Sequence, residues 1–134
     1  MKISSLSSYL LVLSISVLTS SLARSQSADD TFFEKNVRPV LVERCQSCHG
    51  PDKQKSGLRV DSLAALLKGG ESGPALIPGK PSESLLCQVI DQGEPYAMPP
   101  KEKLRKEQIQ SIAAWVKAGA RWPGQSVKAP AANH

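Results

Sequence analysis

The run Cys45-Gln46-Ser47-Cys48-His49 constrains this chain more than any other feature of its sequence. Two thiols three positions apart can add to the two vinyl groups on one edge of a porphyrin. The adjacent imidazole then lies beneath the ring and can bind the iron. The spacing therefore predicts one haem attached covalently through Cys45 and Cys48, with His49 as an axial ligand.

Three other kinds of site use a pair of cysteines at this spacing. A zinc ribbon needs a second pair of ligands, whereas the chain offers only Cys87 and His134 besides the motif. A thioredoxin-like site needs a βαβ setting, which the helical pattern of this chain does not predict. A disulfide between Cys45 and Cys48 would leave His49 without a role. Haem attachment is the interpretation that uses all three residues.

Residues 1–23 have the pattern of an export signal, with cleavage expected between positions 23 and 28. Lys2 supplies a positive charge, and the apolar run from Tyr9 to Leu18 has a length within the ~7–15 residues usual for a signal. A membrane span needs roughly 20 apolar residues, so this run is short for one. We expect export to the periplasm or another extracytoplasmic compartment. The alternative is a retained leader, which would hold the domain close to a membrane.

Helical spacing of apolar residues predicts an all-α domain of three or four helices over residues 31–123, followed by a flexible tail over residues 124–134. The expected helices are one over 31–44 that is kinked or divided at Pro39, a short one capped by Asp61 or Ser62, one over 82–92 capped by Ser82, and one over 104–118. Long loops join them, and such loops are uncommon in a compact domain unless something packs against them. A haem would do so.

An iron bound by His49 has one further axial position, and few side chains of this chain can fill it. Met1 would leave with the leader, so Met98 is the only methionine of the mature chain. It lies in a loop that Pro99 and Pro100 stiffen, and a thioether ligand raises the potential of a haem. The alternative is a methionine that fills a gap in the core. We expect Met98 to bind the iron.

Cys87 is the cysteine that haem attachment leaves over, which is unusual because an exported disulfide framework uses an even number. On the helix expected over 82–92 it projects away from the apolar face, so we expect it outside the core. Three interpretations stay open for Cys87: a thiol with no chemical role, an axial thiolate ligand of the iron, or a thiol that forms an intermolecular disulfide in a dimer.

The formal net charge of +5 is a mild basic bias. No basic run is interleaved with aromatic residues, so nucleic-acid binding is not expected. Lys101, Lys103 and Lys106 follow Met98 and could surround the haem edge for docking to acidic redox partner proteins. The alternative, which the sequence supports equally, is that these lysines are solvent-exposed residues at the start of the last helix and have no docking role.

The run from Phe32 to Pro123 resembles the planctomycete-type cytochrome c domain, one branch of the class I cytochrome c fold. The matching pieces are Val37-Arg38-Pro39-Val40-Leu41, Cys45-Gln46-Ser47-Cys48-His49-Gly50, Ser56-Gly57-Leu58-Arg59-Val60-Asp61, Gly69-Gly70-Glu71-Ser72-Gly73-Pro74-Ala75-Leu76-Ile77-Pro78-Gly79, Ser82-Glu83-Ser84-Leu85-Leu86, Met98-Pro99-Pro100 and Trp115-Val116-Lys117-Ala118-Gly119-Ala120.

The resemblance implies a class I cytochrome c-like domain around one haem c, with His49 and Met98 as axial ligands. It also implies that the Pro74 carbonyl accepts the ring proton of His49 and fixes its orientation. Trp115 would pack the last helix against the first, near Phe33.

The function expected from these features is single-electron transfer between redox partners. Such domains often begin a much longer polypeptide, whereas this chain ends soon after Pro123, which favours a mobile carrier or a subunit. The alternative is a haem-bearing subunit or ligand sensor of a larger periplasmic complex, in which Met98 is displaceable. Catalysis is not expected, because it needs an open iron site with acid–base groups beside it.

Overall fold

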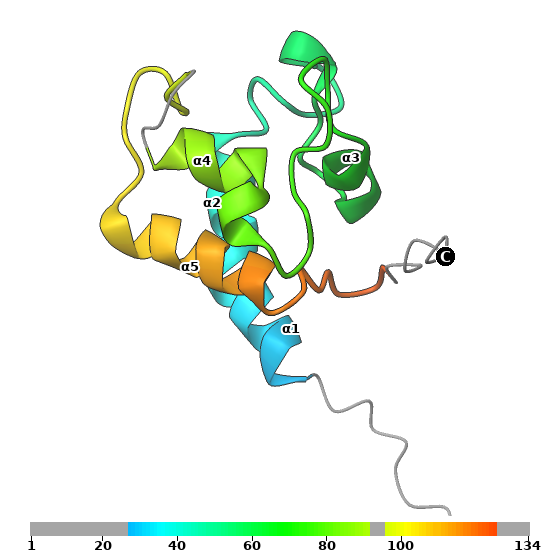
Figure 1. Cartoon of the computed structure of the whole chain (residues 1–134), viewed down its shortest axis with the longest axis vertical. Coiled ribbons are helices and arrows are strands. Elements are labelled where there is room, and N and C mark those ends of the chain that lie inside the picture. The colour runs from blue at the N-terminus through cyan, green and yellow to red at the C-terminus, as the bar shows by residue number, and fades with distance from the viewer. Residues whose placement is uncertain (1–26, 92–95, 126–134) are drawn as a thin grey trace, which may run out of the picture.

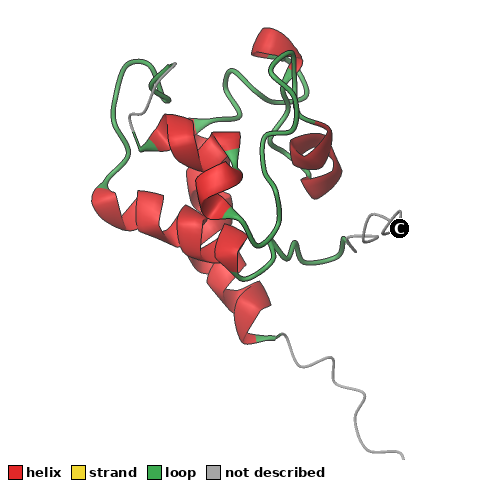
Figure 2. Cartoon of the chain, in the orientation of Figure 1, coloured by secondary structure: helices red, strands yellow, loops and turns green. Residues whose placement is uncertain are grey.

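The structure is a computed structural model, and it describes residues 27–91 and 96–125. The expected leader and residues 126–134 of the expected tail lie outside these ranges. Within them the protein is helical, and β-pairing is limited to isolated bridges (Figure 2). The prediction of an all-α protein is therefore confirmed for the described part of the chain. No helix in that part is long and apolar enough to span a bilayer.

The first helical stretch begins at Ser27, earlier than the sequence predicts. Helix α1 spans Ala28–Phe32, and the Ser27 hydroxyl accepts a hydrogen bond from the Asp30 amide at 3.2 Å. This serine satisfies a backbone donor at the start of the helix, which is the usual role of an N-cap.

Pro39 does not divide this stretch; instead the turn before it widens. A π-helical segment, η1, spans Phe33–Val37, and α2 follows over Arg38–Arg44. The Arg38 amide donates to the Phe33 carbonyl, five residues back. Proline has no amide hydrogen to donate, and a single wide turn accommodates it while the chain stays helical.

An aromatic cluster joins the two ends of the domain. The Phe33 ring lies 5.4 Å from the Trp115 ring and 4.7 Å from the Trp122 ring, measured between centroids. Trp115 belongs to α5 (Lys106–Lys117), which packs across η1. The Arg38 guanidinium lies over the rings of Phe33 and Trp122. The predicted contact between Trp115 and Phe33 is confirmed, and Trp122 adds a third ring.

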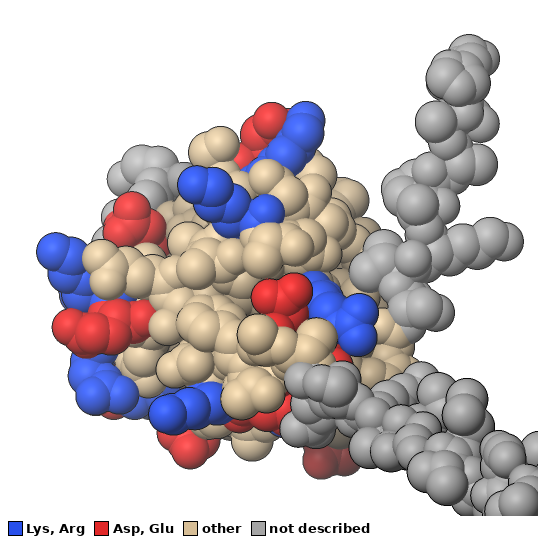
Figure 3. All heavy atoms as spheres, turned by 90° about the horizontal axis from the view of Figure 1, so that it is seen from below, with Lys and Arg blue, Asp and Glu red and all other residues tan. Residues whose placement is uncertain are grey.

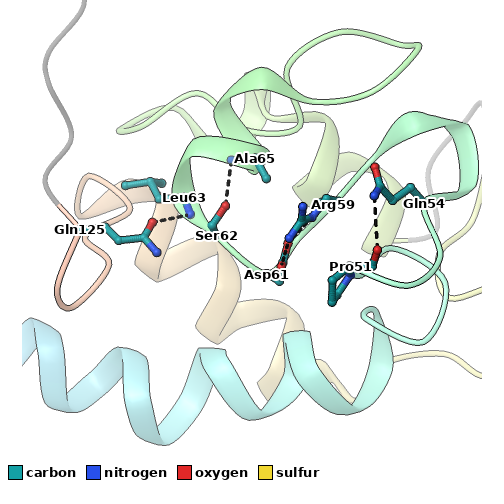
Figure 4. Close-up of polar contacts among 8 residues, drawn as sticks. All are labelled: Pro51, Gln54, Arg59, Asp61, Ser62, Leu63, Ala65 and Gln125. Atoms are coloured by element: carbon teal, nitrogen blue, oxygen red, sulfur yellow. Dashed lines mark hydrogen bonds and ion pairs between the residues drawn. The ribbon is translucent and has the colours of Figure 1, made fainter.

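Helix α3 (Leu63–Lys68) begins as predicted, with Ser62 as its cap (Figure 4). The Ser62 hydroxyl accepts from the Ala65 amide at 3.1 Å, and the Gln125 side chain accepts from the Leu63 amide at 3.0 Å. The helix ends at Gly69, where φ is +70° and an added Cβ would lie 1.8 Å from the Gly73 oxygen. Gln125 thus ties the C-terminal segment to the start of α3.

Helix α4 spans Leu85–Ile90 and packs against α5 (Figure 1). It begins at Ser84, so the expected start at Ser82 is wrong. Ser82 lies in the preceding 3-10 turn η3 (Pro81–Glu83). The buried Ser84 hydroxyl instead donates to the Lys80 carbonyl at 2.8 Å and accepts from the Ile77 amide at 2.9 Å.

Candidate haem site

The cysteine motif forms a tight turn at the end of α2. The Cys45 amide donates to the Leu41 carbonyl at 3.2 Å, and the His49 amide donates to the Cys45 carbonyl at 2.9 Å. Gly50 closes the turn where a side chain has no room, because an added Cβ would lie 2.4 Å from the Gln46 oxygen. As a result, both cysteines and the histidine line the same cavity.

This main cavity has a volume of about 480 Å³. Its lining comes from the end of α2, the motif and its following loop, α4, and the loop that carries Met98. The apolar part of that lining is Leu58, Val60, Leu86, Val89, Ile90, Met98, Pro99 and Pro100. Its size is within the range of about 300–1,000 Å³ typical of cofactor sites. The predicted residues Cys45, Cys48, His49 and Met98 all lie in the wall of this cavity.

A second cavity of about 230 Å³ adjoins the first. The two share His49, Leu58, Val89 and Met98 in their linings. A flat ligand could therefore extend from one cavity into the other and pass both His49 and Met98. At the far wall the hydroxyls of Ser72 and Tyr96 lie 3.4 Å apart.

The imidazole of His49 is oriented by a backbone carbonyl. Its Nδ1 atom lies 3.1 Å from the Lys55 oxygen, in the 3-10 turn η2 (Lys55–Gly57). A proton on Nδ1 is donated to this oxygen, which leaves the lone pair of Nε2 for a metal. The Lys55 amide in turn donates to the Cys48 carbonyl at 3.0 Å, so the motif fixes the position of its own partner.

The partner of His49 differs from the one that the resemblance implied. Pro74 is exposed and lines neither cavity, and Lys55 supplies the carbonyl that contacts the ring. Sequence reasoning missed Lys55 because the contact uses its backbone. No side-chain type in the sequence signals such a role.

The sulfurs of Cys45 and Cys48 are not joined to each other in a disulfide. Burial raises the pKa of Cys45 to about 11, although the neighbouring Arg44 charge acts in the opposite direction. An apolar wall disfavours a thiolate but suits a thioether, which carries no charge. The surroundings of Cys45 therefore suit a sulfur that ends in a covalent bond to a porphyrin.

The loop that carries Met98 is joined to the rest of the site at two points. The Met98 amide donates to the Val89 carbonyl of α4 at 2.8 Å. Further along, Arg44 contacts Glu102 through its guanidinium. Sequence reasoning missed this second contact, because the two residues are 58 positions apart and nothing local pairs them. Met98 itself packs partly buried against the core.

The residues present fit a covalently attached haem. The site offers two thiols, an imidazole with a free Nε2, a thioether and a largely apolar wall. Within residues 27–91 and 96–125, no group of three His, Cys, Asp or Glu side chains could hold a metal ion directly. The zinc-ribbon alternative therefore has no ligand set in that part of the chain.

Cys87 lies outside the haem site but not outside the core. It is half-buried against the core, beside Ile109 and Ala113 of α5 in a third cavity. The expectation that it projects away from the core is wrong, because α5 packs over that side of α4. Burial raises its pKa to about 11. Cys87 lines neither cavity beside His49, which disfavours an axial thiolate. The disulfide dimer remains a prediction.

The segment that contains the motif and the Met98 loop is similar to a known protein family. Residues 45–102 match the family model described as Planctomycete cytochrome C. The match starts at Cys45 and contains His49 and Met98, so it covers the attachment motif and the loop opposite it. The segment is therefore similar to c-type cytochromes, a resemblance that suggests haem-based electron transfer.

The match confirms the resemblance to the planctomycete-type cytochrome c domain over residues 45–102, which are less than half of the chain. Such a domain implies covalent haem c, and both motif cysteines lie within the match. No curated protein and no solved structure matches the chain.

Proposed function

We propose that the protein is an exported mono-haem c-type cytochrome with a class I-like fold, which carries single electrons between redox partners. The observation that carries this proposal is the convergence of Cys45, Cys48, His49 and Met98 on one apolar cavity. A haem bound there supplies an iron that alternates between the ferric and ferrous states. Cys45 and Cys48 would hold it covalently, and His49 and Met98 would be its axial ligands.

The chain's own residues do three things for such a carrier. The Lys55 carbonyl holds His49 in one orientation, with Nε2 directed away from that hydrogen bond. The Met98 amide, bound to Val89, fixes the backbone that carries the thioether. Leu58, Val60, Leu86 and Ile90 form part of the apolar lining of the cavity. An apolar shell around a metal is one means by which proteins adjust its redox potential.

A carrier is favoured over an enzyme by the same ligands. His49 and Met98 together would fill both axial positions of the iron, which leaves no open position for a substrate. Among the described residues His49 is the only histidine, so no second imidazole there could act as a general acid or base. We therefore propose electron transfer without catalysis of a further reaction.

The mouth of the main cavity supports docking to an acidic partner. Lys53, Lys55 and Lys101 line it, with Glu43 and Glu102 beside them. On the face drawn in Figure 3, acidic and basic side chains are interspersed without a large area of one sign. A local group of lysines at the mouth would guide a partner toward the cavity more than the overall charge would. Export, supported by the leader pattern of residues 1–23, places the partner outside the cytoplasm.

Met98→Ala tests the proposal. We expect the wild-type ferric protein to show a thioether-to-iron absorption band at ~700 nm and the ferrous protein to bind carbon monoxide slowly. Met98→Ala should lose the band, bind carbon monoxide readily and retain its covalent haem. Rapid carbon monoxide binding by the wild type would contradict the carrier and favour the ligand sensor. Cys87→Ser serves as the control, because Cys87 lines neither haem cavity.

A further inference from the structure

We propose that Arg44 is a positioning residue that holds the Met98 loop closed over the haem cavity, and that its release admits small ligands to the iron. The contact is called here the Arg44–Glu102 latch. The inference rests on the proposed function, because it takes Met98 as an iron ligand.

The latch joins the attachment motif directly to the loop opposite it. Arg44 is the last residue of α2 and immediately precedes Cys45. Its Nη1 atom lies 3.1 Å from Glu102 Oε2, and its Nη2 atom donates to the Glu102 backbone oxygen at 3.2 Å. Both residues line the main cavity. One side chain thus spans from the cysteine side of the cavity to the methionine side.

The loop has few other attachments near this point. Its start is held by the bond from the Met98 amide to Val89, and its end is held by Leu104, which is buried. Between them, residues 99–103 are exposed or half-buried. Among the described residues, Arg44 is the hydrogen-bonding partner of this stretch. The loop between its two anchors therefore depends on the latch for its position.

The two halves of the latch should contribute unequally. The Glu102 side chain is 78% exposed, whereas that of Arg44 is 25% exposed. Ion pairs open to water contribute little, so the carboxylate half is the weaker one. The bond to the backbone oxygen survives any change of the Glu102 side chain. Loss of Arg44 should therefore have a much larger effect than neutralisation of Glu102.

The test measures the rate at which carbon monoxide binds to the ferrous, haem-loaded full chain by stopped-flow absorbance. We expect Arg44→Met to accelerate binding about tenfold, as for a lost hydrogen bond to a charged donor. Glu102→Gln should change the rate by less than about threefold. Arg44→Lys should fall between them, because a single ammonium does not reproduce the fork of a guanidinium. Lys80→Met is the matched control, because the pair Lys80–Glu83 lines neither haem cavity.

Two results would overturn the inference in distinguishable ways. A wild type with the ~700 nm band and an Arg44→Met rate within about twofold of it would overturn the latch and leave the electron carrier intact. A wild type without the band would remove Met98 as a ligand, and with it both proposals. Should Arg44→Met fail to retain haem, Arg44→Lys decides, and an unchanged rate there overturns the latch.

Discussion

The two halves of this domain are closed by different means. Where α1, η1 and α5 meet, Phe33, Trp115 and Trp122 fill the interior with their own rings. Where the motif, α4 and the Met98 loop meet, side chains leave cavities of about 480 and 230 Å³. The first region is a finished core made by protein alone. The second is a wall built for a large flat apolar body, which is why loops dominate there.

Removal of both attachment sulfurs should produce the largest difference between the two halves. In the double variant Cys45→Ala/Cys48→Ala we expect no covalent haem, and amides of the cavity half, such as Met98 and Val60, should exchange far faster with deuterium. Amides of α5 should keep more of their protection, because the aromatic cluster does not depend on haem. Hydrogen exchange read by mass spectrometry checks this, with Cys87→Ser as the control. Equal loss of protection in both halves would contradict the division.

Phe33→Ala should show how much the finished core contributes. The ring is 0% exposed and touches both tryptophans, so its removal should cost about 3–5 kcal/mol of unfolding free energy. Denaturant unfolding of the haem-loaded protein measures this. Phe32→Ala is the matched control, because the neighbouring ring is 36% exposed and its loss should cost within about 0.5 kcal/mol. Similar losses for both variants would mean that the aromatic cluster is not a stabilising core.

The ion pair between Asp30 and Arg121 should make a smaller contribution, which is seen in how the unfolding free energy depends on pH in acid. Arg121 donates hydrogen bonds to the Asp30 carboxylate at 2.6 and 3.3 Å and lowers the pKa of that carboxyl. Because this pKa is lower in the folded than in the unfolded state, the pair stabilises above about pH 4 and its contribution is lost as the pH falls toward the lowered value. Asp30→Asn should flatten the fall in unfolding free energy below about pH 4. Asp52→Asn, in an exposed loop, is the control, and an unchanged slope for Asp30→Asn would refute the role of the pair.

Some local features of the fold can be predicted from the sequence, and others cannot. The motif, the Met98 loop and the Ser62 cap follow from local spacing and chemistry, and Ser62 caps α3 as expected. The start of α4 cannot be predicted from local spacing, because Ser82 and Ser84 are both residues that can cap a helix. Only the fold shows that the hydroxyl of Ser84 is enclosed by the Ile77–Lys80 segment.

The sequence predicts the four residues that line the cavity together, whereas it does not predict the groups that support them. Cys45, Cys48, His49 and Met98 are rare, chemically distinctive side chains, so their types reveal them. The Lys55 carbonyl and the Arg44–Glu102 latch depend on long-range placement of ordinary groups. Trp122 was missed for a related reason, since its packing on Phe33 requires the C-terminal segment to fold back over η1.

The most direct test of the central claim is to count the haem that remains covalently bound. The full chain would be matured in an export-competent host, its intact mass measured after denaturation, and its pyridine haemochrome spectrum recorded. We predict a mass increase of one haem per chain and the spectrum of a haem with both vinyl groups converted to thioethers. A chain with the unmodified mass and no haem retained after denaturation would contradict the account.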